Sequence, residues 1–279
     1  MIVQHGGVPR TTLVSVFVTS AALAAFAAGC ATAEPEPNAA APAADPAAPQ
    51  RLRAEVKEVL PHDPEAFTQG LEIADGTLYE GTGLNGKSSL RATDPATGAV
   101  RQRTELPADL FGEGITVVGP TIWQLTWQNG VAIKRDRASL AEQRRVEYPG
   151  EGWGLCLDQA ANRLVMSDGS DRLTFRDPET FEPTGEVRVT SNGAPVEEIN
   201  ELECAQGAVF ANIWKTDKVV RIDPGSGRVT AEVDLSGLLT QEEGAKADVL
   251  NGIAAIPGTD EFLVTGKYWP KMFRVSFVP

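Results

Sequence analysis

Short runs of alternating apolar and polar residues, separated by turn residues, recur between residues 51 and 279. Because successive side chains on a strand point to opposite faces, this alternation predicts half-buried β-strands. Asp-Pro pairs at residues 94–95, 177–178 and 223–224 are each followed closely by Thr-Gly or Ser-Gly, a composition typical of the turns between strands. The pattern therefore predicts an all-β fold.

Five segments share one order of features: a polar residue, an apolar strand, a turn and a second strand. They begin at residues 69, 113, 153, 200 and 251, so they are 44, 40, 47 and 51 residues apart. β-rich repeats of about 40–50 residues are typical of propeller blades. We therefore predict a five-bladed β-propeller. The last repeat leaves no room for a fourth strand, and residues 51–60 are predicted to supply an N-terminal strand that closes this last blade and covers its edge.

The first fifty residues have a different composition. Arg10, an apolar run over residues 12–28 and small residues before Cys30 predict an export signal over residues 1–29. Cys30 directly after Gly29 is typical of a lipoprotein, in which this cysteine carries the lipid that tethers the protein to a membrane. Ordinary cleavage that leaves a free cysteine is the alternative. Residues 30–50, mostly Ala, Pro, Glu and Asp, predict an extended linker to a domain over residues 51–279.

Net charge and the positions of the cysteines bear on nucleic-acid binding and on disulfide formation. The chain has 38 acidic and 25 basic residues and a net charge of −13, which excludes the basic face that nucleic acids require. Cys156 lies one residue after Leu155, whereas Cys204 lies two after the equivalent Leu202. Their side chains are therefore expected on opposite strand faces, as two buried thiols rather than a disulfide.

The repeat also predicts where polar side chains gather. In a propeller, the residues before the inner strands and those after the second strands meet at one end of the central channel. The first set is Gln69, Glu113, Trp153, Asn200 and Asn251, and the second includes Glu80 and residues 124–127, 167–168, 212–214 and 265–267. A single Asn or Gln at such a position more commonly caps a strand or binds water. The whole set, with its tryptophans, predicts a ligand pocket.

Two familiar kinds of site are excluded. Residues 81–88 match the phosphate-loop pattern GxxxxGK[ST], but a hairpin turn and a strand are predicted there, not the helix that phosphate binding requires. His5 and His62 are the only histidines, and His5 is predicted to leave with the signal, so a histidine zinc site cannot be assembled. His62 is expected to stabilise a turn. The chemistry must then rely on carboxylates, a lysine and hydrogen-bond donors.

Eight segments, with every repeat represented, together resemble the plant and bacterial type of glutaminyl-peptide cyclotransferase. They are residues 62–71 (HDPEAFTQGL), 79–80 (YE), 124–127 (QLTW), 152–155 (GWGL), 166–169 (MSDG), 200–203 (NELE), 211–214 (ANIW) and 265–270 (TGKYWP). The resemblance implies a five-bladed propeller that converts the N-terminal glutamine of peptides and proteins to pyroglutamate with loss of ammonia. It also implies catalysis without zinc.

The resemblance further implies a role for individual residues. Glu80 is the expected proton-transferring residue. The expected substrate-binding residues are Phe67, Gln69, Trp127, Trp153, Asn200, Glu201, Trp214 and Lys267. No cofactor and no catalytic metal are expected, although a structural Ca²⁺ bound by oxygens is compatible with an acidic propeller. We expect a monomer in the cell envelope or periplasm that touches the membrane only through the lipid at Cys30.

The reaction is consistent with these groups. An N-terminal amine has a pKa near 7.7–8.0, so part of it is already a neutral nucleophile at pH 7. The amide nitrogen must gain a proton before it leaves, and a carboxyl in an aromatic site can deliver it. Gln69, Asn200 or an indole N–H is expected to hold the developing oxyanion. The alternative is a non-catalytic envelope propeller that binds peptide or protein partners; a lactonase-like metal propeller lacks the ligand set.

Overall fold

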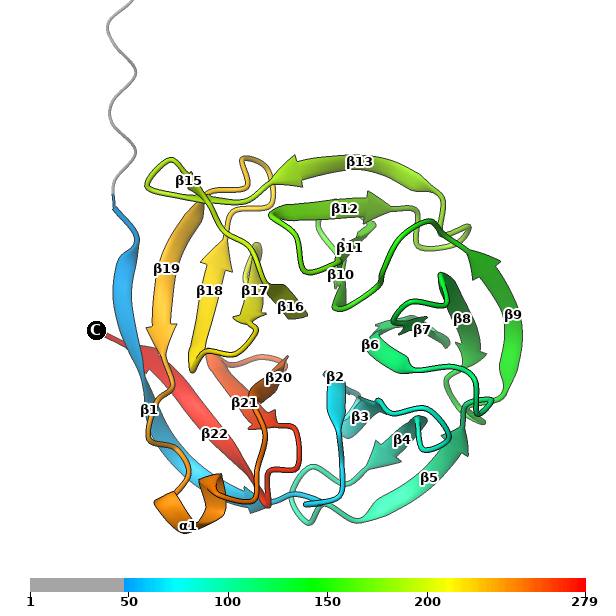
Figure 1. Cartoon of the computed structure of the whole chain (residues 1–279), viewed down its shortest axis with the longest axis horizontal. Helices are drawn as coiled ribbons and strands as arrows, with labels where there is room; N and C mark the ends of the chain where they lie inside the picture. The colour runs from blue at the N-terminus through cyan, green and yellow to red at the C-terminus, as the bar shows by residue number, and fades with distance from the viewer. Residues whose placement is uncertain (1–47) are drawn as a thin grey trace, which may run out of the picture. The chain divides into compact units, whose positions relative to one another are not determined.

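The computed structural model describes residues 48–279, whose regular structure is almost entirely β-strand, joined by turns and loops (Figure 1). The predicted signal, Cys30 and most of the predicted linker lie outside the described residues. Within residues 48–279 the single helix is one turn long, α1 (Gln241–Gly244), and no helix there is long and apolar enough to cross a membrane. The predicted all-β fold is confirmed.

The first three repeats each form an antiparallel sheet of four strands in chain order. The sheets are β2 (Thr68–Ala74), β3 (Thr77–Thr82), β4 (Ser89–Thr93) and β5 (Val100–Glu105); β6 (Gly112–Val118), β7 (Thr121–Thr126), β8 (Val131–Asp136) and β9 (Glu142–Glu147); and β10 (Leu155–Asp158), β11 (Arg163–Ser167), β12 (Arg172–Arg176) and β13 (Pro183–Arg188). A small hairpin, β14 (Thr190–Ser191) and β15 (Ala194–Pro195), follows β13.

The last two repeats share one sheet of eight strands. Its spatial order is β16 (Ile199–Ala205), β17 (Ala208–Ile213), β18 (Lys218–Ile222), β19 (Val229–Asp234), β1 (Gln50–Pro61), β22 (Lys271–Val278), β21 (Glu261–Gly266) and β20 (Leu250–Ala255). β1 pairs antiparallel with β22 and parallel with β19. The predicted pairing of residues 51–60 with the last strand is thus confirmed, and β1 covers the edge of β19 as well.

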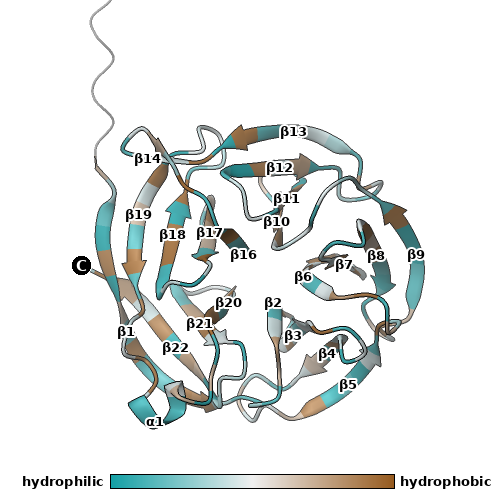
Figure 2. Cartoon of the chain, in the orientation of Figure 1, coloured by the Kyte–Doolittle hydropathy of each residue, from teal (hydrophilic) through white to brown (hydrophobic). Residues whose placement is uncertain are grey.

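Apolar side chains fill the space between neighbouring sheets. Ile115 of the second sheet packs in one cluster with Tyr79 of the first, and Leu71 of the first sheet packs with Leu263 of β21. Figure 1 shows the sheets around a common centre, with β2, β6, β10, β16 and β20 innermost. The peripheral strand β9 is mostly exposed and hydrophilic (Figure 2). Burial between sheets therefore holds the innermost strands around one centre.

Two glycines show how closely the innermost strands approach. A Cβ atom on Gly70 would lie 2.6 Å from the backbone nitrogen of Ile115, and one on Gly114 would lie 2.6 Å from the carbonyl oxygen of Trp153. Only glycine fits where two backbones come this close. The polar residues that immediately precede these glycines are brought together as a result.

The expectation of two free thiols is wrong, because Cys156 on β10 and Cys204 on β16 form a disulfide with Cα atoms 5.4 Å apart. The two strands belong to neighbouring sheets that pack against each other. Neighbouring sheets around the centre have the same orientation, so one face of the first sheet packs against the opposite face of the second. Side chains on opposite faces of equivalent strands therefore point toward each other, so the alternation that we took as evidence against the bond favours it.

Candidate active site

A chain of hydrogen-bonded side chains crosses three of the innermost strands at the second residue of each. Asn251 Nδ2 donates to Gln69 Oε1 at 3.2 Å and to the carbonyl oxygen of Thr68 at 2.9 Å. Gln69 Nε2 in turn donates to Glu113 Oε1 at 2.8 Å. Three of the repeat-start residues therefore meet as the repeat predicts, and the amide of Gln69 is oriented with its NH₂ group toward Glu113.

Glu113 is a buried carboxyl with one oxygen left over. Its side chain is on β6, the residue is 4% exposed, and Oε2 has no hydrogen-bond partner among the described residues. Burial raises the pKa of Glu113 well above its usual range, the positive charge of Lys267 opposes this shift, and the negative charge of Glu151 adds to it. A carboxyl with a raised pKa is a stronger base when ionised and can return the proton once it has taken it, which is the property of a general acid–base group.

Six half-buried aromatic residues lie within two residues of strand ends, and we call them the aromatic arc: Tyr268, Phe67, Phe111, Trp127, Trp153 and Trp214. The ring centroids are 5.3 Å apart for Tyr268 and Phe67, 6.0 Å for Phe67 and Phe111, 5.5 Å for Phe111 and Trp127, and 5.4 Å for Trp153 and Trp214. Edge contacts of this kind hold the rings in fixed orientations.

The arc residues lie just outside the ends of the strands. Phe67 precedes β2, Trp127 follows β7, Trp153 precedes β10 by two residues and Trp214 follows β17. Lys267 follows β21, and its Nζ lies 4.7 Å from the centroid of the Phe67 ring. Burial lowers the pKa of Lys267, although Glu113 and Asp248 oppose the shift. The predicted residues Phe67, Gln69, Trp127, Trp153, Trp214 and Lys267 are thus gathered at one end of the strands, and the buried Asn200 is the second residue of β16, at the same end.

The structure does not support Glu80 as the proton-transferring residue. Arg91 donates to Glu80 Oε2 from Nε at 2.9 Å and from a terminal nitrogen at 2.7 Å. Oε1 accepts from Thr68 Oγ1 at 2.7 Å and lies 3.1 Å from His62 Nε2. Although burial opposes ionisation, the charges of His62 and Arg91 and their hydrogen bonds lower the pKa of Glu80 to about 2. Both oxygens are occupied and the carboxylate holds no proton near pH 7.

The direction of the Glu80 side chain has a simple cause. The next residue, Gly81, faces β6, since a Cβ there would lie 2.8 Å from the carbonyl oxygen of Glu113. Adjacent residues on a strand point to opposite faces, so Glu80 points away from Glu113. It meets the ring of His62 instead, whose Nδ1 lies 2.7 Å from the carbonyl oxygen of Trp269. The bonds of His62 therefore join distant segments rather than stabilise its own turn as predicted, and they make it part of the Glu80 ion cluster.

Glu201 is also placed differently from its prediction. Its Oε1 accepts the backbone N–H of Leu71 at 3.1 Å, and its Oε2 accepts that of Ile253 at 2.8 Å. The residue is 1% exposed. Both oxygens therefore join β2 and β20 at the centre of the fold, and neither is free to bind a substrate.

Sequence reasoning placed Glu113 among the polar residues of the pocket but gave it no catalytic role, and it missed Phe111 and Tyr268 as members of the site. Glu113 carried a signal, because it is the only carboxyl among the five residues that begin the repeats. Phe111 and Tyr268 carried none, since an aromatic residue beside a strand end is common in any β fold. Their ring contacts with Phe67 become visible only in the folded chain.

The phosphate-loop match forms a turn, as predicted. Lys87 and Ser88 both donate backbone hydrogen bonds to the carbonyl oxygen of Leu84, at 2.9 and 2.8 Å. β4 begins at the next residue, Ser89, so this segment lacks the helix N-terminus that binds phosphate.

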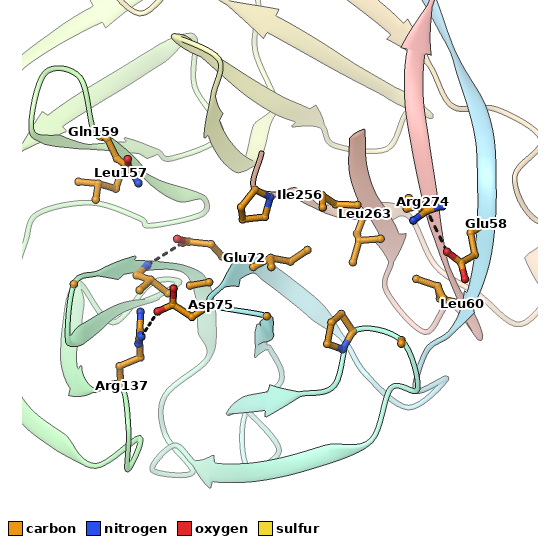
Figure 3. Close-up of a pocket in the computed structure, with 18 residues that line it drawn as sticks. Glu58, Leu60, Glu72, Asp75, Arg137, Leu157, Gln159, Ile256, Leu263 and Arg274 are labelled. Atoms are coloured by element: carbon orange, nitrogen blue, oxygen red, sulfur yellow. Dashed lines mark hydrogen bonds and ion pairs between the residues drawn. The ribbon is translucent and has the colours of Figure 1, made fainter. Parts of the chain in front are cut away.

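A cavity of about 740 Å³ lies at the other ends of these strands, lined by Asp75 after β2 and Gly119 after β6 (Figure 3). Glu72 faces it and accepts a hydrogen bond from the backbone nitrogen of Val117 at 2.8 Å. None of the predicted site residues lines this cavity. We therefore place the candidate active site at Glu113 and the aromatic arc.

Comparison with known proteins identifies the relatives of this chain. A family model described as glutamine cyclotransferase matches residues 22–277. A glutaminyl-peptide cyclotransferase of Arabidopsis thaliana is 39% identical over 227 residues, which cover 80% of this chain and 70% of the relative. The crystal structure of Myxococcus xanthus glutaminyl cyclase is 38% identical, with a TM-score of 0.74, and the match covers 82% of this chain and 98% of that one.

Proposed function

Because this chain belongs to the glutamine cyclotransferase family, we propose that it converts the N-terminal glutamine of peptides and proteins to pyroglutamate with release of ammonia. The observation that carries this conclusion for the chain's own residues is Glu113, a buried carboxyl with one unpartnered oxygen beside Gln69 and the aromatic arc. The reaction is an acyl transfer, since the γ-acyl group of glutamine moves from its amide nitrogen to the α-amine.

We assign the proton transfer to Glu113 in place of Glu80. The α-amine attacks the side-chain amide carbon, so a C–N bond forms and the amine nitrogen must lose a proton. The amide nitrogen then gains a proton, its C–N bond breaks and ammonia leaves. Glu113 Oε2 is suited to take the first proton as a carboxylate and, once protonated, to give the second to the amide nitrogen. It has no other hydrogen-bond partner among the described residues, and burial raises its pKa, which makes it a stronger base than an ordinary carboxylate.

The substrate-binding residues are proposed to be Phe67, Gln69, Trp127, Trp153, Asn200, Trp214 and Lys267. Rings of the aromatic arc provide apolar surface on either side of the glutamine side chain. The Lys267 ammonium and the Asn200 amide are the groups proposed to stabilise the oxyanion that develops during attack. Gln69 is proposed to hold Glu113 in the orientation needed for proton transfer.

The test is whether the purified full-length protein releases ammonia from a synthetic peptide that begins with glutamine. Mass spectrometry of the peptide should show the loss of one ammonia, at a rate above that of the peptide alone. The matched control is the same peptide acetylated at its N-terminus, which lacks the nucleophile and should not react. An unchanged glutamine peptide would favour the non-catalytic envelope propeller instead.

We further propose that the domain over residues 51–279 is a five-bladed β-propeller. The eight-stranded sheet contains two groups of four strands that meet at the parallel pairing of β19 with β1. Together with the three separate sheets, this division makes five groups, one for each repeat. β1 would then be the outermost strand of the fifth blade.

Catalysis is proposed to need no metal, because a carboxyl, two amides and an ammonium group can supply the proton transfer and the charge stabilisation. Dialysis against a chelator should leave kcat and KM for the glutamine peptide within about twofold of their starting values. Activity that is lost in chelator and restored by zinc would contradict the proposal. A lower melting temperature alone would not, since an oxygen-bound structural Ca²⁺ is compatible with the acidic chain.

We propose that the protein is exported to the cell envelope as a monomer tethered through Cys30. The apolar run at residues 12–28 and the small residues before Cys30 support this assignment. The intact mass of membrane-extracted protein should correspond to a chain that begins at Cys30 and carries lipid. A mature chain that begins elsewhere or keeps Met1 would be inconsistent with the anchor.

A further inference from the structure

A single carboxylate links the two halves of the aromatic arc. Glu151 Oε2 accepts a hydrogen bond from Trp127 Nε1 at 2.7 Å and another from Trp153 Nε1 at 2.9 Å. Gln128 Nε2 donates to the other oxygen, Oε1, at 2.8 Å. An indole has one N–H, so each of these bonds restricts the rotation of its ring about the side-chain torsions.

The chain around Glu151 is held independently of its side chain. The backbone nitrogen of Gly152 donates to the carbonyl oxygen of Trp127 at 3.0 Å, which joins the segment before β10 to the end of β7. A Cβ atom on Gly152 would lie 2.1 Å from the Tyr148 hydroxyl oxygen, so this backbone is closely packed. A change of the Glu151 side chain should therefore release the two indoles without displacing the segment.

Glu151 is ionised at neutral pH. Partial burial works against its charge, but hydrogen bonds from Trp153, Gln128 and Trp127 outweigh burial and hold the pKa of this carboxyl below its usual range. A charged acceptor forms shorter and stronger hydrogen bonds than a neutral one. Both indole rings are thus oriented by one strong acceptor before any substrate arrives.

We propose that Glu151 is a positioning residue for the cyclisation reaction, which holds Trp127 and Trp153 in the orientation that receives the N-terminal glutamine. This inference rests on the proposed function. It also assigns the two indole N–H groups to Glu151 and thereby removes them as donors to the oxyanion. That task falls to Asn200 and Lys267.

Three substitutions separate positioning from simple charge. Glu151→Ala removes the acceptor. Glu151→Asp keeps the charge, but its side chain is one methylene shorter and cannot reach both indoles. Glu151→Gln loses the charge but keeps one oxygen that can accept from both indoles. Its NH₂ group can donate to the side-chain oxygen of Gln128 once the exposed Gln128 amide rotates.

Positioning predicts that the Ala and Asp variants behave alike and that Gln restores the wild-type behaviour. Each side chain that must be ordered on binding weakens affinity by roughly 2- to 10-fold, so two released indoles should raise KM roughly 4- to 100-fold. kcat should change less than about threefold, because Glu151 does not touch the reacting atoms and its charge is the smallest of the three influences on the pKa of Glu113. Glu142→Ala, which removes an exposed carboxylate of β9, is the matched control and should alter neither constant.

Near-ultraviolet circular dichroism provides a readout that does not depend on activity. The tryptophan signal should weaken in the Ala and Asp variants and remain in Gln and in the Glu142→Ala control. An inactive wild type would contradict the proposed function, whereas the dichroism would still report on the indoles.

Positioning is refuted if Glu151→Asp keeps a wild-type KM while Glu151→Gln loses it, since charge alone would then be required. An unchanged KM in both the Ala and Asp variants would also refute it. Should the Ala variant fail to fold, the comparison of Asp with Gln decides.

Discussion

Replacement of Glu113 by Gln should lower kcat for a glutamine peptide by roughly 10²–10⁴-fold, which corresponds to about 3–5 kcal/mol of activation free energy. The substitution keeps the shape of the side chain and a partner for Gln69, whose Nε2 donates to Glu113 Oε1 at 2.8 Å. It removes only the proton that the proposed mechanism transfers. KM should change little, because binding is assigned mainly to the aromatic arc.

The matched control for this measurement is Glu72→Gln. Glu72 is another carboxyl on an inner strand, and burial raises its pKa to about 7, but it faces the cavity at the other ends of the strands. Its replacement should leave kcat within a few-fold of the wild type. A folded Glu113→Gln protein that keeps more than about a tenth of wild-type kcat would remove Glu113 from the mechanism, since a positioned acid–base group contributes at least ~10²-fold.

Replacement of Glu80 by Ala should lower the free energy of unfolding by about 3–5 kcal/mol, the usual cost of removing one partner of a buried ion pair. The guanidinium of Arg91 would then be left buried with Asp63, which is half-exposed, as its remaining carboxylate partner. Denaturant unfolding at pH 7 measures this change. Glu105→Ala, which breaks an exposed pair with Arg103 on β5, is the control and should cost less than about 1 kcal/mol.

Catalysis distinguishes this structural role from the one first predicted for Glu80. Glu80→Gln, assayed well below its melting temperature, should keep more than about a tenth of wild-type kcat. A loss of 10²-fold or more in a fully folded Glu80→Gln protein would return Glu80 to the mechanism. Substitution at position 80 should therefore mainly lower stability, whereas substitution at position 113 should mainly lower kcat.

The same ion cluster makes stability depend on pH. The pKa of Glu80 falls from an ordinary value of 4.5 to about 2 in the folded chain. Its contribution is therefore complete above about pH 4.5 and is lost as the pH falls toward 2. Although burial opposes it, the charge of Glu80 and hydrogen bonds raise the pKa of His62, so the contribution of His62 is lost as the pH rises above 6.5. Wild-type protein should lose more unfolding free energy between pH 5 and pH 2 than Glu80→Ala does.

Local pattern determined the class of fold and the place of the site. Alternation along residues 51–60 predicted the strand β1, and five repeat starts predicted which residues meet at the ends of the inner strands. These features follow from the period of a strand and from turn chemistry, which depend on neighbours in the sequence. Gln69 and Glu113 meet for this reason, because each precedes a glycine that lets two inner strands approach.

Tertiary structure decided which carboxyl is free to react. The sequence places both Glu80 and Glu113 among the polar residues at one end of the strands. In the folded chain Arg91 lies opposite Glu80 on β4 and His62 arrives from the segment after β1, whereas Oε2 of Glu113 has no partner among the described residues. The disulfide depended on the same kind of information, since the strand faces of Cys156 and Cys204 acquire meaning only once their sheets are neighbours. A carboxyl's charge state and a thiol's partner are set by groups that lie close in space, and strand alternation reports only the face from which a side chain leaves.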